Sequence, residues 1–209
     1  MSDNASPAAS ASLLSKHRIE ALSDGVFAVV MTLLVLEIKP EMEPHAGDEA
    51  VRHMLRALGL PVLTFAFAFL ISCIFWNLHH RKFALLRHTN AVHTTLSLVF
   101  LFTVTLLPVS VSIYLHAKTS YLAQTIYYGN FTLIALPLLL SWLYARRAGL
   151  VDAAQPAEIV RRLTMRMFAV TLLGVIATVA SYIGQPYVLF LIVPVILYLR
   201  HRKPKPATT

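Results

Sequence analysis

An arginine, a serine and an aspartate stand at the start of the first long apolar run of the chain. Arg18 precedes the run, and from Ala21 to Leu36 only Ser23, Asp24 and Thr32 are polar. About 20 helical residues, rising about 1.5 Å each, cross the hydrocarbon core of a bilayer. An ionisable group on such a helix is costly unless it is paired or lines a cavity. Asp24 therefore indicates either a polar network between helices or a functional site.

The spacing of these residues separates two faces of the expected helix. Side chains three, four and seven positions apart share a face. Ser23 and Asp24 project about 120° or more from the middle of a stripe that is small or apolar apart from one hydroxyl. That stripe consists of Leu22, Gly25, Val29, Thr32, Leu33 and Leu36. We expect Asp24 to point towards other helices and Arg18 to lie at the mouth of the stripe.

The stripe has two interpretations. In an arbitrary apolar helix, such a face packs against lipid or against the protein core. Alternatively it forms the wall of a pore, in which rings of apolar side chains narrow the path and gate it by dewetting. The sequence contains no Thr-Val-Gly-Tyr-Gly segment, so a filter of backbone carbonyls is not expected.

The composition is that of an integral membrane protein. Of the 209 residues, 57% are hydrophobic and 13% are charged, against about 25% charged in a soluble domain. The net charge of +8 comes from basic residues between apolar runs and not along one face, which argues against a nucleic-acid partner. There is no Gly-x-Ser-x-Gly motif and Cys73 has no nearby sequence partner, so we expect no enzyme activity and no cofactor.

Hydropathy predicts an all-α protein with six transmembrane helices. The expected spans are 18–38, 54–78, 91–115, 121–144, 167–183 and 187–199, with Gly184-Gln185-Pro186 dividing the last apolar stretch into two short helices. Residues 1–15 are expected to form a disordered cytoplasmic tail, 16–200 the transmembrane domain and 201–209 a basic cytoplasmic tail. Fourteen of the 18 Lys and Arg residues fall on the side of both termini, which predicts that both termini are cytoplasmic.

Histidines suggest a second class of function. Nine are present, and His79, His80, His88 and His93 fall in one region. The pairs His79/His93 and His80/His93 would suit ligation of haem or a metal between helices. No His-Glu-x-x-His or Cys/His spacing accompanies them, so a histidine-bearing membrane redox or metal-binding protein is the alternative hypothesis.

Two short motifs resemble those of a known family. Arg18, three residues and then Leu22-Ser23-Asp24-Gly25 resemble the R-x-x-x-F-S-D-G signature of the transmembrane protein 175 family, the lysosomal potassium channel and its bacterial relatives. Leu22 stands where that family often has Phe. Trp76, two residues and then His79 are similar to the W-x-x-H region that follows a later helix in the family.

The resemblance implies a bacterial member of that family that conducts cations passively and prefers potassium. It implies a homotetramer in a bacterial plasma membrane, the cell inner membrane, with the first helix of each copy around a central pore. Val29 would then form the narrowest apolar ring, Thr32 a hydroxyl ring, and Leu33 or Leu36 the next level. Its partners would be further copies of itself, the bilayer and monovalent cations, with K⁺ as the permeant ion.

The polar residues at the start of the first helix also acquire a role from the resemblance. Arg18, Ser23, Asp24, Trp76 and His79 would form a network that holds the pore helix to its neighbours. Direct contact with ions is the alternative for this network. A non-conducting helical scaffold is a third possibility for the protein as a whole.

Overall fold

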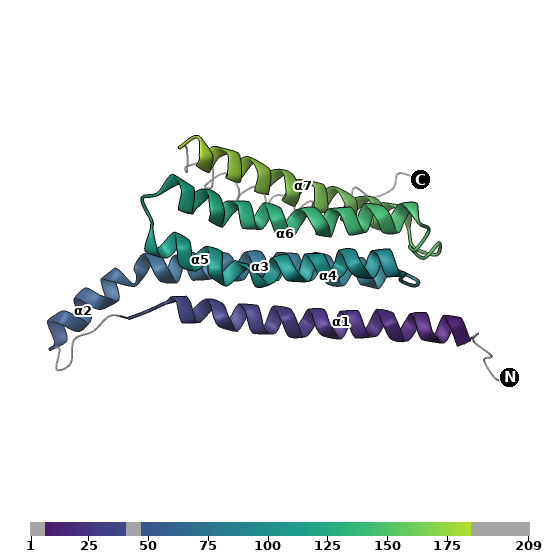
Figure 1. The fold of residues 1–209 in the computed structure, drawn as a ribbon, viewed down its shortest axis with the longest axis horizontal. Helices are drawn as coiled ribbons and strands as arrows, with labels where there is room; N and C mark the ends of the chain where they lie inside the picture. Colours follow the sequence, from purple (N-terminus) through teal and green to yellow (C-terminus); the bar gives the residue numbers. More distant parts are fainter. Residues whose placement is uncertain (1–6, 41–46, 185–209) are drawn as a thin grey trace, which may run out of the picture.

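The computed structural model describes residues 7–40 and 47–184, with side chains from Lys16 onward. In this part of the chain the regular elements are helices that run side by side as a bundle (Figure 1). They are α1 (Pro7–Leu33), the 3₁₀ turn η1 (Leu34–Glu37), α2 (Asp48–Ala57), α3 (Gly59–Leu85), α4 (Ala91–Thr105), α5 (Leu107–His116), α6 (Tyr121–Arg147) and α7 (Ala157–Tyr182).

Five stretches of the described chain are long and apolar enough to cross a membrane. They are Lys16–Glu37, Gly59–Leu85, Ala91–His116, Tyr121–Arg147 and Ala157–Tyr182. The described part of the chain is therefore that of an all-helical membrane protein, as composition and hydropathy predicted. The sixth expected span, 187–199, lies outside the described residues.

The boundaries of the second span were predicted wrongly. The expected span 54–78 is divided in the structure, because α2 ends at Ala57 and α3 begins at Gly59. Pro61 cannot donate a backbone N–H to the carbonyl of Ala57, which interrupts the helical ladder at this point. At its other end α3 continues to Leu85, so most of the basic link expected at residues 79–88, between the second and third spans, is helical.

The helix α1 begins at Pro7, inside the segment 1–15 that was expected to be a disordered tail. Proline suits the first helical position, where its missing N–H leaves no hydrogen bond unmade. The division of the chain at residues 15 and 200 stays a prediction.

The third span is interrupted just before Pro108. The break lies at Leu106, between α4 and α5. The Asn130 side chain on α6 donates a hydrogen bond to the carbonyl of Thr103 at 3.3 Å, and Ser110 Oγ donates to the carbonyl of Leu107 at 2.8 Å. Side chains thus supply hydrogen bonds to the backbone where the ladder is broken, which is necessary inside a membrane.

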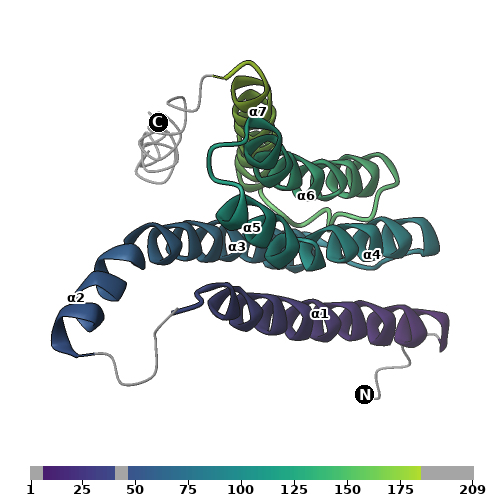
Figure 2. The same ribbon diagram turned by 60° about the vertical axis from the view of Figure 1, so that its left-hand side comes forward.

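Two groups of helices share one core. Helix α1 packs against α3 and α4, while α6 joins α4 and α5 on one side to α7 on the other (Figure 2). Phe83, Phe100, Val111, Ile134 and Trp142 at the centre of the core are fully buried. The core therefore holds α1 by one face only.

The contact between α6 and α7 depends on a glycine. A Cβ at position 174 would lie 3.3 Å from the Thr132 Cα and 3.0 Å from its Oγ1, tighter than most real Cβ contacts, so Thr132 would have to move by a few tenths of an ångström. We expect Gly174→Ala to lower the free energy of unfolding by about 1–3 kcal/mol, the usual range for overpacking. Thermal unfolding in detergent measures this loss.

Gly129→Ala is the matched control at the same interface. The new Cβ would meet Thr178 Cγ2 at an ordinary contact distance of 3.7 Å. The midpoint of thermal unfolding of this variant should therefore equal or exceed that of the wild type. Equal midpoints for the two variants would show that the α6–α7 contact does not require a glycine at position 174.

Candidate functional site

Helix α1 has one packed face and one open face. Ile19, Ser23, Phe27, Val30 and Leu34 are buried. The Phe27 ring lies with its centre 5.9 Å from that of Phe100 on α4. The open face carries the stripe that was expected from the sequence: Leu22, Gly25, Val29, Thr32, Leu33 and Leu36 are all exposed in the single chain. The stripe therefore does not belong to the core of its own chain.

The open face is apolar with one hydroxyl. Val29 is 56% exposed. Thr32 Oγ1 lies 2.8 Å from the carbonyl of Val29 and 3.0 Å from that of Ala28, to which it donates. Because its proton points at the backbone of its own helix, its lone pairs remain free to accept from water or to contact a cation.

The open face ends in a turn that is wound more tightly than an α-helix. The α-helix ends at Leu33, and Leu34–Glu37 forms a 3₁₀ turn. Side chains three residues apart eclipse in a 3₁₀ turn, which keeps Leu36 in line with Leu33. Both remain exposed, so the apolar stripe extends to the end of this span.

Gly25 lies on the open face, one turn before Val29. A Cβ at this position would meet nothing within 4 Å in the chain itself. Packing within a single chain therefore does not require a glycine at position 25.

The structure brings Asp24 and Trp76 together. Trp76 Nε1 on α3 donates a hydrogen bond to Asp24 Oδ1 at 2.8 Å. The Trp76 ring also stacks on His80, with ring centres 5.6 Å apart. A bond between an indole N–H and a carboxylate is charge-assisted, and this one ties α1 to α3.

The other three residues of the expected network form no hydrogen bond with this pair in the described part of the chain. Ser23 is buried and its Oγ donates to the carbonyl of Ile19 on its own helix at 2.7 Å. The His79 ring is buried and stacks on Phe100 at 4.9 Å between ring centres. Arg18 is exposed and forms no ion pair with the described residues. The five residues therefore do not form one hydrogen-bonded cluster in a single chain.

A buried lysine was missed by the sequence analysis. Lys82 was expected in a basic surface link, but it is 0% exposed. Its Nζ donates to Ser141 Oγ on α6 at 2.9 Å and to Ser97 Oγ on α4 at 3.3 Å, and it lies 4.9 Å from the centre of the Phe83 ring. These two hydroxyls and the ring take the place of water around the amine, and they join α3, α4 and α6.

The two buried histidines, His79 and His93, both lie against the ring of Phe83. The Phe83 ring lies 4.7 Å from His79 and 5.4 Å from His93 between ring centres. In the part of the chain that the structure describes, no three His, Cys, Asp or Glu side chains gather as they would around a metal ion. The alternative of a metal or redox protein gains no support from this arrangement.

Comparison with known proteins agrees with the motifs. The profile of the family described as "Endosomal/lysosomal potassium channel TMEM175" matches residues 18–108, which include both motifs. A potassium channel of Streptomyces collinus is 31% identical over 179 residues, which cover 82% of this chain and 85% of that protein. A potassium channel of Chamaesiphon minutus is 34% identical over 134 residues, covering 63% of this chain and 66% of that protein.

A solved structure and a human protein extend the comparison. The crystal structure of a lysosomal potassium-selective channel TMEM175 homolog from Chamaesiphon minutus matches with a TM-score of 0.74 and 27% identity, over 90% of this chain and 97% of that one. The human endosomal/lysosomal proton channel TMEM175 is 36% identical over 96 residues, which are 42% of this chain and 19% of that protein. With most of the Streptomyces protein matched at this identity, the chain belongs to the TMEM175 family of ion channels.

Proposed function

We propose that this chain is one subunit of a homotetrameric channel that conducts cations passively and prefers potassium. The observation that carries the proposal is the open face of α1. A membrane-spanning helix that is packed on one side and bare on the other has room for further copies and for a path between them. Four copies around α1 give that face a common axis, as in closed symmetric oligomers.

In this proposal the open face forms successive levels along the pore. Val29 provides the narrowest apolar ring, and Thr32 provides a ring of hydroxyl oxygens about 4.5 Å further along the helix. Leu33 or Leu36 forms the next apolar level. Such rings pass ions only when they are wetted, and an ion that loses its water more easily passes more readily. K⁺ holds its water less tightly than Na⁺, which favours K⁺ at an apolar constriction.

Proton relays through membranes use chains of Asp, Glu and His side chains. None of these is among the six residues of the stripe that we place on the pore. We therefore favour conduction of a metal cation over the proton conduction for which the human relative is named.

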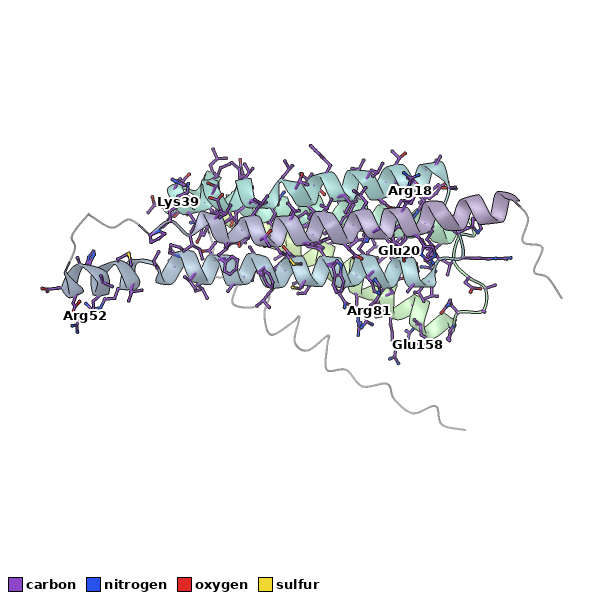
Figure 3. All side chains as sticks on the ribbon, turned by 90° about the horizontal axis from the view of Figure 1, so that it is seen from below. Arg18, Glu20, Lys39, Arg52, Arg81 and Glu158 are labelled. Carbon is purple, nitrogen blue, oxygen red and sulfur yellow. The ribbon has the colours of Figure 1, made fainter. Side chains whose placement is uncertain are left out.

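Asp24 and Trp76 hold α1 at the correct rotation in this proposal. Arg18 lies at the cytoplasmic mouth, and Ser23 and His79 support the helix from its packed side. Figure 3 shows Arg18, Arg81 and Glu158 towards one end of the bundle, with Lys39 and Arg52 towards the other. By the positive-inside rule, the excess of Lys and Arg makes the first of these ends the cytoplasmic one. Both termini then lie on the cytoplasmic side of a bacterial plasma membrane.

Val29→Ala should widen the constriction and weaken the preference for potassium over sodium. The change removes two methyl groups from each copy, so sodium need not lose its water to pass. Potassium and sodium flux from vesicles containing the purified protein measure the effect. Proton flux in the same vesicles distinguishes a proton pathway.

The matched control is Val179→Ala on α7, which is exposed to a similar extent, 53% against 56% for Val29. It should leave the ratio of the two fluxes unchanged. An unchanged ratio in Val29→Ala would remove Val29 from the pore.

Thr32→Val should lower potassium conductance while assembly stays normal. The substitution keeps the shape of the side chain and removes the oxygen that faces the proposed path. Single-channel recording in planar bilayers measures the effect. Wild-type conductance and selectivity in this variant would assign Thr32 to packing.

Disrupting the bond between Asp24 and Trp76 should damage assembly more than selectivity. Trp76→Phe leaves the carboxylate without its donor. It should lower the stability of the assembled protein by about 1.5–3 kcal/mol, as for hydrogen bonds to charged groups. Asp24→Asn keeps an acceptor and should cost less. Size-exclusion chromatography after stepwise heating measures loss of the oligomer. Normal assembly together with altered permeation would instead place Asp24 in the ion path.

A further inference from the structure

Helix α2 has two chemically different faces. At 100° per residue its apolar side chains fall on one half and its charged and polar side chains on the other. The apolar face consists of Ala50, Val51, Met54 and Leu55, and the polar face of Asp48, Glu49, Arg52, His53 and Arg56. None of these residues is buried, and Leu55 is 59% exposed. Among the described helices α2 contacts only α3, so none of the others covers its apolar face.

Helix α3 fixes the depth of α2. The 27 residues of α3 measure about 40 Å, more than the hydrocarbon core of about 30 Å. Leu60 and Leu63 in the first turns of α3 are exposed and apolar, so lipid surrounds α3 up to this end. Only Leu58 separates α2 from α3. The end of α2 that joins α3 therefore lies at the level of the lipid headgroups.

The break at Leu58 lets α2 leave the line of α3. Pro61 gives no N–H to Ala57, and Gly59 adds no side chain that would resist bending. Figures 1 and 2 show α2 turned away from the line of α3. A helix that turns at the headgroup level is able to lie along the membrane surface.

Two arginines give α2 a preference for phosphate. Arg52 and Arg56 lie one turn apart on the polar face, both exposed, and neither forms a salt bridge with the described residues. A guanidinium group binds phosphate oxygens in pairs, and its long stem lets it reach headgroups while its helix lies at the edge of the acyl chains.

We propose that α2 lies in the lipid–water interface, with its apolar face among the upper acyl chains and Arg52 and Arg56 on the phosphates of anionic phospholipids. An amphipathic helix with basic residues on its polar face is typical of such a position. A helix of ten residues is marginal in water, and the interface would supply the burial that stabilises it. The proposal holds whether or not the protein conducts potassium.

Spin labels on single cysteines test the placement. In a Cys73→Ser background, Leu55→Cys labels the apolar face and Glu49→Cys labels the polar face. The full chain is placed in vesicles of phosphatidylcholine, with and without phosphatidylglycerol. Accessibility of each label to oxygen, which dissolves in acyl chains, is compared with its accessibility to a water-soluble nickel chelate.

We expect the label at position 55 to favour oxygen and the label at position 49 to favour the nickel chelate. Equal exposure of both labels to nickel would place α2 in water and overturn the proposal. An immobilised label at position 55 that neither reagent reaches would also overturn it, because protein, such as a second copy, would then cover the face.

The arginines are tested in the same vesicles. Phosphatidylglycerol should move the label at position 55 deeper into the acyl chains, which raises its accessibility to oxygen relative to nickel. The double variant Arg52→Gln with Arg56→Gln should abolish this effect of phosphatidylglycerol. Lys118→Gln is the control, since Lys118 is an exposed cation in the turn before α6 at the same end of the bundle. If phosphatidylglycerol had its full effect on the label in the double variant, the proposal that Arg52 and Arg56 contact lipid phosphates would be wrong.

Discussion

The rotation of α1 about its own axis is the constraint on which the rest of the account depends. Within a membrane, an apolar face is as stable against lipid as against protein, so apolar packing alone fixes a helix weakly. A carboxylate is different, because leaving it unpaired among lipids is costly. The bond from Trp76 Nε1 to Asp24 Oδ1 therefore fixes which face of α1 meets α3, and with it which face stays open. Phe27, Val30 and Leu34 complete the packed side.

The same reasoning explains how the other helices hold their places. Lys82 joins α3 to α4 and α6 through Ser97 and Ser141, and Asn130 joins α6 to the bend before Pro108. Between α6 and α7, close packing at Gly174 acts together with polar bonds, such as that from Trp142 Nε1 to Thr164 Oγ1 at 2.8 Å. Helix α3 carries both Trp76 and Lys82, so it connects the open helix to the rest of the bundle. A displacement of α3 would therefore also change the rotation of α1 and the direction of its open face.

Much of this arrangement could be predicted from the sequence, because helical periodicity decides it. The open stripe from Leu22 to Leu36 and the direction of Asp24 both follow from 100° per residue. The start of α3 could not be found in this way, since Met54 and Leu55 of the amphipathic helix α2 merge with the apolar run after them. Lys82 was assigned to a surface link because a lysine usually ends a span. Its spacing of three residues from His79 and seven from Phe75, both buried, was the signal that it faces the core.

The central claim is that ions pass along the open face of α1. Leu36 is 64% exposed near the end of that face, so a cysteine at this position in a Cys73→Ser background is open to a charged, membrane-impermeant thiol reagent. The measurement is potassium efflux from vesicles before and after labelling. The account predicts that labelling abolishes the efflux, because four added charged groups would crowd the path. Unchanged efflux with every cysteine labelled would contradict it and place the path elsewhere.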